Sequence, residues 1–157
     1  MEGVSQLENK DYNLERLTEK AIIWAQEQSH IILETGTSLS ASEVELAKVV
    51  SVEHPELVRV IEVDTIPAPS DPEIKSIVES TGLFGPNIAG ITFGYGIYIK
   101  KNQRNNRLMS HELRHVYQYE QAGSVRNFLL NYIHELLSVG YANAPLELDA
   151  KNHEQKT

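Results

Sequence analysis

The feature that most constrains this chain is a pair of histidines four residues apart, in the run His111-Glu112-Leu-Arg-His115. Residues four apart lie on one face of an α-helix, so both imidazoles can reach a single ion. Glu112 stands beside them as a candidate base for a water molecule activated by that ion. The H-E-x-x-H spacing suits zinc-dependent hydrolysis. A catalytic zinc usually takes three protein ligands and one water, so a third ligand must come from elsewhere in the chain.

Composition limits both the ligands and the partners. The 157 residues include no cysteine, so a metal must take nitrogen and oxygen donors. The 22 acidic residues exceed the 14 basic ones, for a net charge of −8. That balance argues against nucleic acid bound through its phosphates and against anionic membrane surfaces. The length is typical of one domain, and we expect a single domain over residues 1–157.

No membrane or secretion signal is recognisable. The opening residues, Met1-Glu-Gly-Val-Ser-Gln, lack a basic stretch followed by an apolar one. Apolar runs stay well short of the roughly 20 residues that a membrane span requires. We therefore expect a cytoplasmic protein, and the sequence does not indicate its oligomeric state.

Residues 12–52 are predicted to form the N-terminal helices. Helical spacing of apolar residues predicts the first helix, with Gly36 as its stop. Ser40 followed by Glu43 has the pattern of a capping box and predicts the start of the second helix.

Residues 57–100 are predicted to contain strands and one helix. The short run Leu57–Val63, rich in Val, Ile and Leu, is typical of a buried strand. Asp71-Pro72 has the pattern of an N-cap followed by proline at the first helical position, which predicts a helix there.

The segment after this helix has two possible structures. Large apolar residues alternate with small or polar ones at Ile91, Phe93, Tyr95, Ile97 and Ile99. As one strand, the run would have one apolar face, and Gly94 and Gly96 would leave the other bare enough for a helix to approach closely. Alternatively, Gly94-Tyr95-Gly96 is a turn, and Ile97–Lys100 is the second arm of a hairpin.

Residues 106–152 are predicted to form the metal-site helices. The motif helix spans about Asn106–Ala122 and ends at Gly123. Its apolar stripe consists of Met109, Leu113 and Val116, and the two histidines lie on the opposite side. A helix over Ser124–Gly140 and a short one over Leu146–Asn152 follow.

Two glutamates compete to be the third ligand. Glu135 comes 20 positions after His115, and Glu147 comes 32 positions after it. Either can return to the histidines, because a helix antiparallel to the motif helix brings the chain back. Glu135 shares a helical stripe with polar residues, which indicates a solvated face. Glu147 has small and apolar neighbours that suit an inward side chain, so we favour Glu147.

The run His-Glu-Leu-Arg-His, followed by a helix that bears a glutamate, resembles the gluzincin branch of the zincin metallopeptidases. The offset of Glu135 matches the thermolysin-like spacing, whereas Pro-Leu-Glu147-Leu-Asp-Ala150 resembles the Glu-x-x-Ala ligand segment of minimal gluzincin-like domains. The resemblance covers about Ile88–Ala150. Lys151 departs from it, since no acid follows Ala150 to support a histidine, and Asp149 is a candidate for that task.

The resemblance implies an α+β fold, a helix-rich zincin-like metalloprotease domain with a small, mostly antiparallel sheet over the active-site helix. It implies that Gly96, Ile97 and Tyr98 belong to the edge strand that those enzymes place above the cleft. An exposed edge aligns an extended peptide through backbone hydrogen bonds.

The expected function is that of a zinc metallopeptidase acting on a peptide or protein substrate. His111, His115 and Glu147 would hold Zn²⁺, and Glu112 would be the general base. Three tyrosines are candidates for stabilising the developing oxyanion: Tyr98, Tyr119 and Tyr141. The alternatives are a non-catalytic zinc-binding or interaction domain of the same fold, and a chance occurrence of the motif on a surface helix. The intact Glu112 argues against the non-catalytic alternative, because zinc binding alone needs no base.

Overall fold

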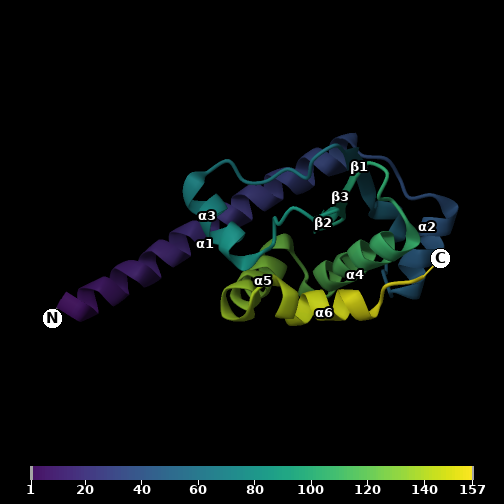
Figure 1. Ribbon diagram of the computed structural model, residues 1–157. Helices are drawn as coiled ribbons and strands as arrows, with labels where there is room; N and C mark the ends of the chain where they lie inside the picture. The colour runs from purple at the N-terminus through teal and green to yellow at the C-terminus, as the bar shows by residue number, and fades with distance from the viewer. Residues whose placement is uncertain (1, 157) are drawn as a thin grey trace.

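A small β-sheet lies between two groups of helices (Figure 1). The computed structural model describes the backbone of residues 2–156 and the side chains of residues 13–156. The helices of this part are α1 (Glu2–Thr35), α2 (Ala41–Val49), α3 (Pro72–Thr81), α4 (Asn106–Ala122), α5 (Val125–Val139) and α6 (Pro145–Asn152). The strands are β1 (Arg59–Val63), β2 (Gly90–Phe93) and β3 (Gly96–Lys100). The protein is therefore α+β and rich in helices, as predicted.

The helix ends confirm the predicted caps. The capping box is complete, because the Ser40 hydroxyl accepts from the Glu43 amide and the Glu43 carboxylate accepts from the Ser40 amide. The Asp71 carboxylate caps α3, and α4 ends at Gly123 with φ +90°. Glycine suits this position because it has no side chain, and the left-handed backbone is costly for residues that have one. One boundary differs: α1 begins at Glu2, ahead of the predicted helical region.

The sheet is mixed, with strand order β1-β3-β2. β1 runs parallel to β3, and β2 runs antiparallel to it. The prediction of a mostly antiparallel sheet is therefore wrong, because there is one pair of each kind. The reason lies in the connections: a two-residue turn joins β2 to β3, whereas the chain between β1 and β3 crosses over through α3 and returns in the same direction.

The hairpin alternative for residues 88–100 is confirmed, and the single strand is wrong. The turn at Gly94 and Tyr95 places Ile91 opposite Tyr98 and Thr92 opposite Ile97. Cross-strand partners share a face of the sheet. The apolar residues of the two arms therefore point to opposite faces, although they alternate without interruption in the sequence.

The expected edge strand is in the centre of the sheet. β3 pairs with β1 on one side and β2 on the other, so its backbone has no free edge for a peptide. The prediction that Gly96, Ile97 and Tyr98 belong to an edge strand is therefore wrong, and all three residues are buried. Their predicted part in substrate binding rested on that free edge and loses this support. The crossover places β1 on the outer side of β3, and β2 is the edge strand next to the motif helix.

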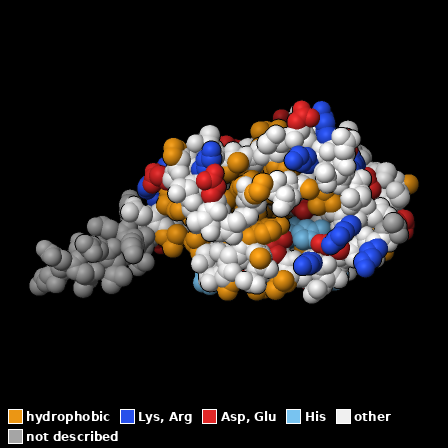
Figure 2. Space-filling model, in the orientation of Figure 1, with side chains coloured by type: hydrophobic (Ala, Val, Ile, Leu, Met, Phe, Trp, Pro, Cys, Tyr) orange, Lys and Arg blue, Asp and Glu red, His pale blue; other side chains and the backbone are white. Residues whose placement is uncertain are grey.

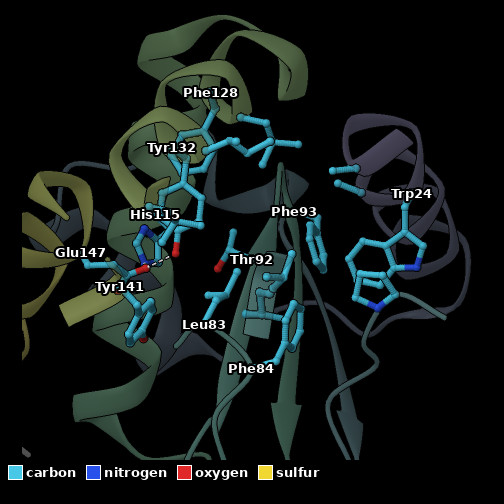
Figure 3. A pocket seen from close by; sticks show the side chains of 18 of the residues that line it. Trp24, Leu83, Phe84, Thr92, Phe93, His115, Phe128, Tyr132, Tyr141 and Glu147 are labelled. Atoms are coloured by element: carbon cyan, nitrogen blue, oxygen red, sulfur yellow. Dashed lines mark hydrogen bonds and ion pairs between the residues drawn. The ribbon is translucent and has the colours of Figure 1, made fainter. Parts of the chain in front are cut away.

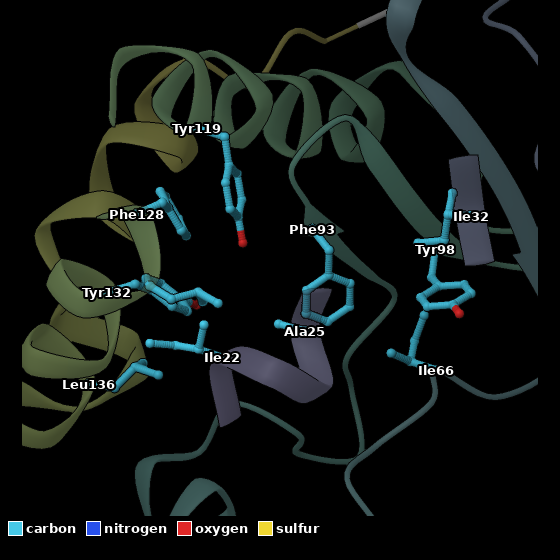
Figure 4. Close-up of a cluster of buried hydrophobic side chains, with 11 residues drawn as sticks. Ile22, Ala25, Ile32, Ile66, Phe93, Tyr98, Tyr119, Phe128, Tyr132 and Leu136 are labelled. Atoms are coloured by element: carbon cyan, nitrogen blue, oxygen red, sulfur yellow. The ribbon is translucent and has the colours of Figure 1, made fainter. Parts of the chain in front are cut away.

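Each face of the sheet has its own apolar core. The core towards α1 and α5 includes Ile22, Ile32, Phe93, Tyr98, Phe128 and Tyr132 (Figure 4). The core towards α2 and α4 includes Val50, Val60, Ile97, Ile99, Leu113 and Val116. This second core holds the predicted apolar stripe of α4, so α4 is anchored by one side while its other side is turned towards α5 and α6.

Glycines on the sheet let helices approach both faces closely. A Cβ on Gly96 would lie 2.9 Å from the Cβ of Ile32 on α1. A Cβ on Gly90 would lie 3.1 Å from the Cγ of Glu112 on α4. The edge strand β2 therefore lies directly against the glutamate of the histidine motif.

Candidate metal centre

The two histidines of α4 meet on one face, as their spacing predicts. The imidazole centroids of His111 and His115 are 5.0 Å apart, and the rings are nearly perpendicular. His111, Glu112 and His115 each offer a donor atom, and these three atoms lie within 4.8 Å of one another. The group could therefore hold a metal ion.

Glu147 on α6 completes the arrangement around the histidines. Its Oε2 lies 3.1 Å from Nε2 of His111, and its Oε1 lies 3.1 Å from Nε2 of His115. Two ligands of one tetrahedral zinc, each at its usual bond length, stand about 3.4 Å apart. The carboxylate therefore lies within one metal-ligand spacing of each histidine, through a different oxygen in each case. Tyr132 on α5 donates a hydrogen bond to Glu147 Oε1 at 2.7 Å, which holds the carboxylate in place.

Glu135, the other candidate, has a different partner. Its Oε1 accepts a hydrogen bond at 2.8 Å from the backbone amide of Leu146, at the start of α6. Glu135 thus supports the helix that carries Glu147.

The histidines and Glu147 form a buried, charge-coupled group. His115 is 6% exposed and Glu147 is 7% exposed. Burial alone would raise the pKa of Glu147, but the charge of His115 and the hydrogen bond from His111 hold it far below its usual range. Burial would lower the pKa of His111, but its bond to Glu147 and the charge of Glu112 raise it to about 9. A buried carboxylate of this kind needs positive charge beside it, from protonated histidines or from a cation.

Glu112 is buried between α4 and the edge strand β2. Burial raises the pKa of its carboxyl, which makes the carboxylate a stronger base. The Thr92 hydroxyl donates to Glu112 Oε1 at 2.9 Å and fixes the orientation of the carboxylate. The glutamate of the motif is therefore held beside the histidines by a residue of the sheet.

A second layer of side chains orients both imidazoles. Nδ1 of His111 lies 2.8 Å from Oε2 of Glu154, and Nδ1 of His115 lies 2.8 Å from Oε1 of Gln118. Gln118 in turn donates to Asp149 at 2.8 Å. Asp149, predicted as a possible support for a histidine, thus reaches His115 through Gln118. Such outer partners orient the ligands of metal sites.

Sequence reasoning missed Glu154 and Gln118 for different reasons. Gln118 follows His115 by three positions on one helix, a spacing at which side chains meet, so this signal was available. Glu154 comes after the end of α6, 43 positions beyond His111, and no local pattern connects the two residues.

The three tyrosines predicted as oxyanion donors differ in their hydrogen-bond partners and in their positions. The Tyr98 hydroxyl donates to Gln28 at 2.7 Å, and the Tyr119 hydroxyl donates to the backbone carbonyl of Thr92 at 3.1 Å. Tyr141 lines the same cavities as Glu112, and its pKa is raised by burial and by the charge of Glu147. Of these cavities, Tyr119 lines only the pocket that borders His115, whereas Tyr141 lines both.

Two cavities of different character meet at Glu112. An open cleft of about 630 Å³ has walls of mixed character, and its polar residues include Asn105, Arg107, His111 and Glu154. Figure 2 shows histidine atoms at the bottom of a hollow, with acidic and basic side chains beside them. On the other side, a smaller and mostly apolar pocket of about 80 Å³ borders His115 and Glu147 (Figure 3). Glu112 and Tyr141 line both cavities.

Comparisons of the chain with protein-family models, curated proteins and solved structures give no match. Among the described residues, none of the helices has the length and apolar character needed to cross a bilayer. The structure therefore supports a His-Glu-His group, with Glu112 and His115 buried and His111 partly buried, that could bind a metal ion.

Proposed function

We propose that the protein is a zinc-dependent metallopeptidase in which His111, His115 and Glu147 hold the metal and Glu112 is the general base. The observation that carries the proposal is the buried Glu147 carboxylate, which reaches Nε2 of both histidines at 3.1 Å. Two imidazoles and one carboxylate are the ligand set of many catalytic zinc sites. The fit is good in chemistry as well as in spacing, because the centre has nitrogen and oxygen donors in a chain without cysteine.

The residues around the centre suit peptide hydrolysis. Bound zinc would polarise the scissile carbonyl and lower the pKa of a water molecule towards neutrality. Glu112, with its raised pKa, would serve as the base that accepts a proton from the attacking water and returns it to the leaving amine. The Tyr141 hydroxyl borders the same space and is suited to donate to the developing oxyanion.

The edge strand β2 offers backbone groups with which an extended substrate can pair. β2 is terminal in the sheet, and its residues line the two cavities that meet at Glu112. An extended peptide that adds to this edge would place its backbone beside the motif helix. β2 therefore takes the role that the sequence assigned to β3.

The test separates metal binding from catalysis. Protein purified without chelator should contain about one zinc per chain, measured by elemental analysis. Glu112→Gln keeps the size of the side chain and removes its basicity, so zinc content should stay near wild type while hydrolysis of an unbiased peptide library falls by about 100-fold or more. Glu120→Gln is the matched control, because it makes the same change on the same helix. The Glu120 carboxylate accepts hydrogen bonds from the amides of Glu53 and His54 instead of bordering the histidines, so zinc content and hydrolysis should both stay near wild type.

Three results would count against the proposal. Failure to bind zinc would remove the metal site. Loss of zinc in Glu112→Gln would show that Glu112 is a ligand instead of a base. Tight zinc binding without cleavage of any library peptide, and no measurable difference between wild type and Glu112→Gln, would favour a non-catalytic zinc-binding domain.

A further inference from the structure

The side chain of Glu112 lies against two alternate residues of the edge strand. Gly90 and Thr92 of β2 are on the face of the sheet that α4 covers, because their cross-strand partners Ile99 and Ile97 belong to the core on that face. A Cβ on Gly90 would lie 3.1 Å from the Cγ of Glu112 and 3.2 Å from its Cδ. The Thr92 hydroxyl lies 2.9 Å from Glu112 Oε1. The glutamate therefore crosses the bare surface of Gly90 and ends against Thr92.

Thr92 is tied to the motif helix by its backbone as well as by its side chain. Its carbonyl oxygen accepts a hydrogen bond from the Tyr119 hydroxyl at 3.1 Å, and Tyr119 belongs to α4. Both Thr92 and Glu112 are buried, with 6% and 3% of their surfaces exposed. A hydrogen bond to a charged acceptor is stronger in such surroundings than in water. In Figure 3, Thr92 is directed towards the side of the strand on which His115 lies.

The Thr92 hydroxyl has one proton to donate and two acceptors within reach. Besides Oε1 at 2.9 Å, the backbone carbonyl oxygen of Glu112 lies 3.2 Å from it. When Glu112 is ionised, the charged Oε1 is the stronger acceptor. When Glu112 has taken up a proton, the hydroxyl can turn to the backbone carbonyl, and its lone pairs can accept from the neutral carboxyl group. Thr92 can thus stay hydrogen-bonded to Glu112 in either protonation state.

We infer that Thr92 is a positioning residue for the proposed reaction, whose hydroxyl holds the Glu112 carboxyl group in one place before and after it takes up a proton. The inference rests on the proposed function. In that reaction one proton passes from the attacking water to Glu112 and then to the leaving amine, and Thr92 neither gains nor loses a proton. A base that keeps one orientation serves both transfers without a rearrangement between them.

Removal of the hydroxyl is the first test. Thr92→Val keeps the shape of the side chain, so zinc content and KM should stay near wild type while kcat falls by about 10- to 100-fold, the scale of a lost hydrogen bond to a charged group. Thr92→Ser keeps the hydroxyl and should recover most of kcat. Thr37→Val is the matched control, because the Thr37 hydroxyl donates to the Val60 carbonyl at the opposite edge of the sheet; kcat should not change.

A second measurement needs no turnover. Acetohydroxamic acid gives up a proton when it binds zinc, and a base beside the metal is suited to hold that proton. Titrated by calorimetry into the zinc-loaded protein, it should bind about tenfold more weakly to Thr92→Val than to wild type, and Thr92→Ser should restore the affinity. In a Glu112→Gln background, Thr92→Val should change the affinity little, because Thr92 acts through Glu112.

Gly90→Ala tests the position of the carboxyl group independently, should Thr92→Val fail to fold. The added methyl group would press on Cγ and Cδ of Glu112 and leave the Thr92 hydroxyl intact. A displacement of the base should lower kcat by about tenfold without loss of zinc. Wild-type kcat in Gly90→Ala would show that the placement of Glu112 against β2 does not matter to the reaction, and would overturn the inference.

The remaining outcomes separate this inference from the proposed function. Wild-type kcat and hydroxamate affinity in Thr92→Val would overturn the role of Thr92 and leave the peptidase intact. An equal loss of affinity from Thr92→Val with and without Glu112→Gln would do the same, because Thr92 would then act on the fold instead of on the base. Absence of zinc binding would overturn both proposals. The predicted hydroxamate affinities without any turnover would support the role of Thr92 and count against the peptidase.

Discussion

The two helices that follow the motif helix, α5 and α6, each carry a glutamate that could have completed the centre, and they use it differently. Glu147 lies in the first turn of α6, and its carboxylate reaches both histidines. Glu135 lies near the end of α5, and its carboxylate accepts the Leu146 amide. The residue type is the same and both spacings are acceptable, so packing alone separates them.

The two glutamates act in series. The N-cap residue of α6 is Ala144, whose side chain cannot accept a hydrogen bond, and Pro145 follows it. Glu135 takes over the task of an N-cap from the neighbouring helix. The comparison teaches that a carboxylate need not face the histidines to matter to the centre. Glu135 caps the first turn of α6, and that turn carries the proposed ligand Glu147.

Of the changes that separate the two glutamates, Glu147→Ala is expected to have the largest effect on zinc affinity. It removes one of three proposed ligands and leaves two buried histidines without their carboxylate. Zinc affinity, measured by competition with a chromophoric chelator, should fall by more than about 100-fold, beyond the usual cost of losing an outer partner. Should Glu135→Ala abolish zinc binding instead, the thermolysin-like spacing would be the right guide.

A smaller loss of zinc affinity is expected when Glu154 is changed. Its carboxylate orients His111, and Arg107 pairs with it from the outer side. Glu154→Ala should weaken zinc binding by about 10- to 100-fold, and Glu154→Gln, which keeps an acceptor oxygen, should recover part of this loss. Glu45→Ala, an exposed glutamate on α2, serves as the control. Equal affinities of the Ala and Gln variants would contradict an orienting role.

Tyr132→Phe should lower zinc affinity by about fivefold, which is the scale of losing one hydrogen bond of about 1 kcal/mol. The change removes only the hydroxyl that donates to Glu147. Tyr119→Phe is the matched control, because Tyr119 is a buried tyrosine in the same aromatic stack whose hydroxyl bonds to the Thr92 backbone. Similar losses of zinc affinity in both variants would show that the hydroxyl of Tyr132 has no particular role at the centre.

The smallest effect on zinc is expected from Glu135→Ala. Loss of the external cap should lower the free energy of unfolding by about 1 kcal/mol, measured by denaturant titration of the zinc-free protein. Glu135→Gln keeps an acceptor oxygen and should recover most of that loss. A Glu135→Ala variant as stable as wild type would remove the capping role and, with it, the link between the two helices.

The elements predicted correctly are those specified by neighbours in the chain. The capping box of Ser40 and Glu43, the Asp71 cap and the Gly123 stop all depend on hydrogen bonds or backbone angles within a few residues. The pairing of His111 with His115 depends on helix geometry in the same way. Local rules were sufficient for these features because their partners are set by covalent spacing.

The strand assignments show where local rules stop. The alternation of apolar residues through Gly94 is equally compatible with one strand and with a hairpin, because both bury large side chains. Which edge of β3 receives β1 depends on a crossover through α3, and no pattern within β3 records it. The edge strand was therefore placed on β3, whereas the edge strands are β1 and β2 and β3 lies between them.

The sequence by itself determined the motif helix, the two histidines that meet on it, and the glutamate between them. The tertiary structure decided that Glu147 faces both histidines, that Glu135 and Glu154 support the centre from outside, and that an apolar pocket lies beside Glu112. The physical reason is range. A turn of helix sets distances between residues three or four apart, whereas the approach of α5 and α6 to α4 is set by the packing of side chains distant in the chain.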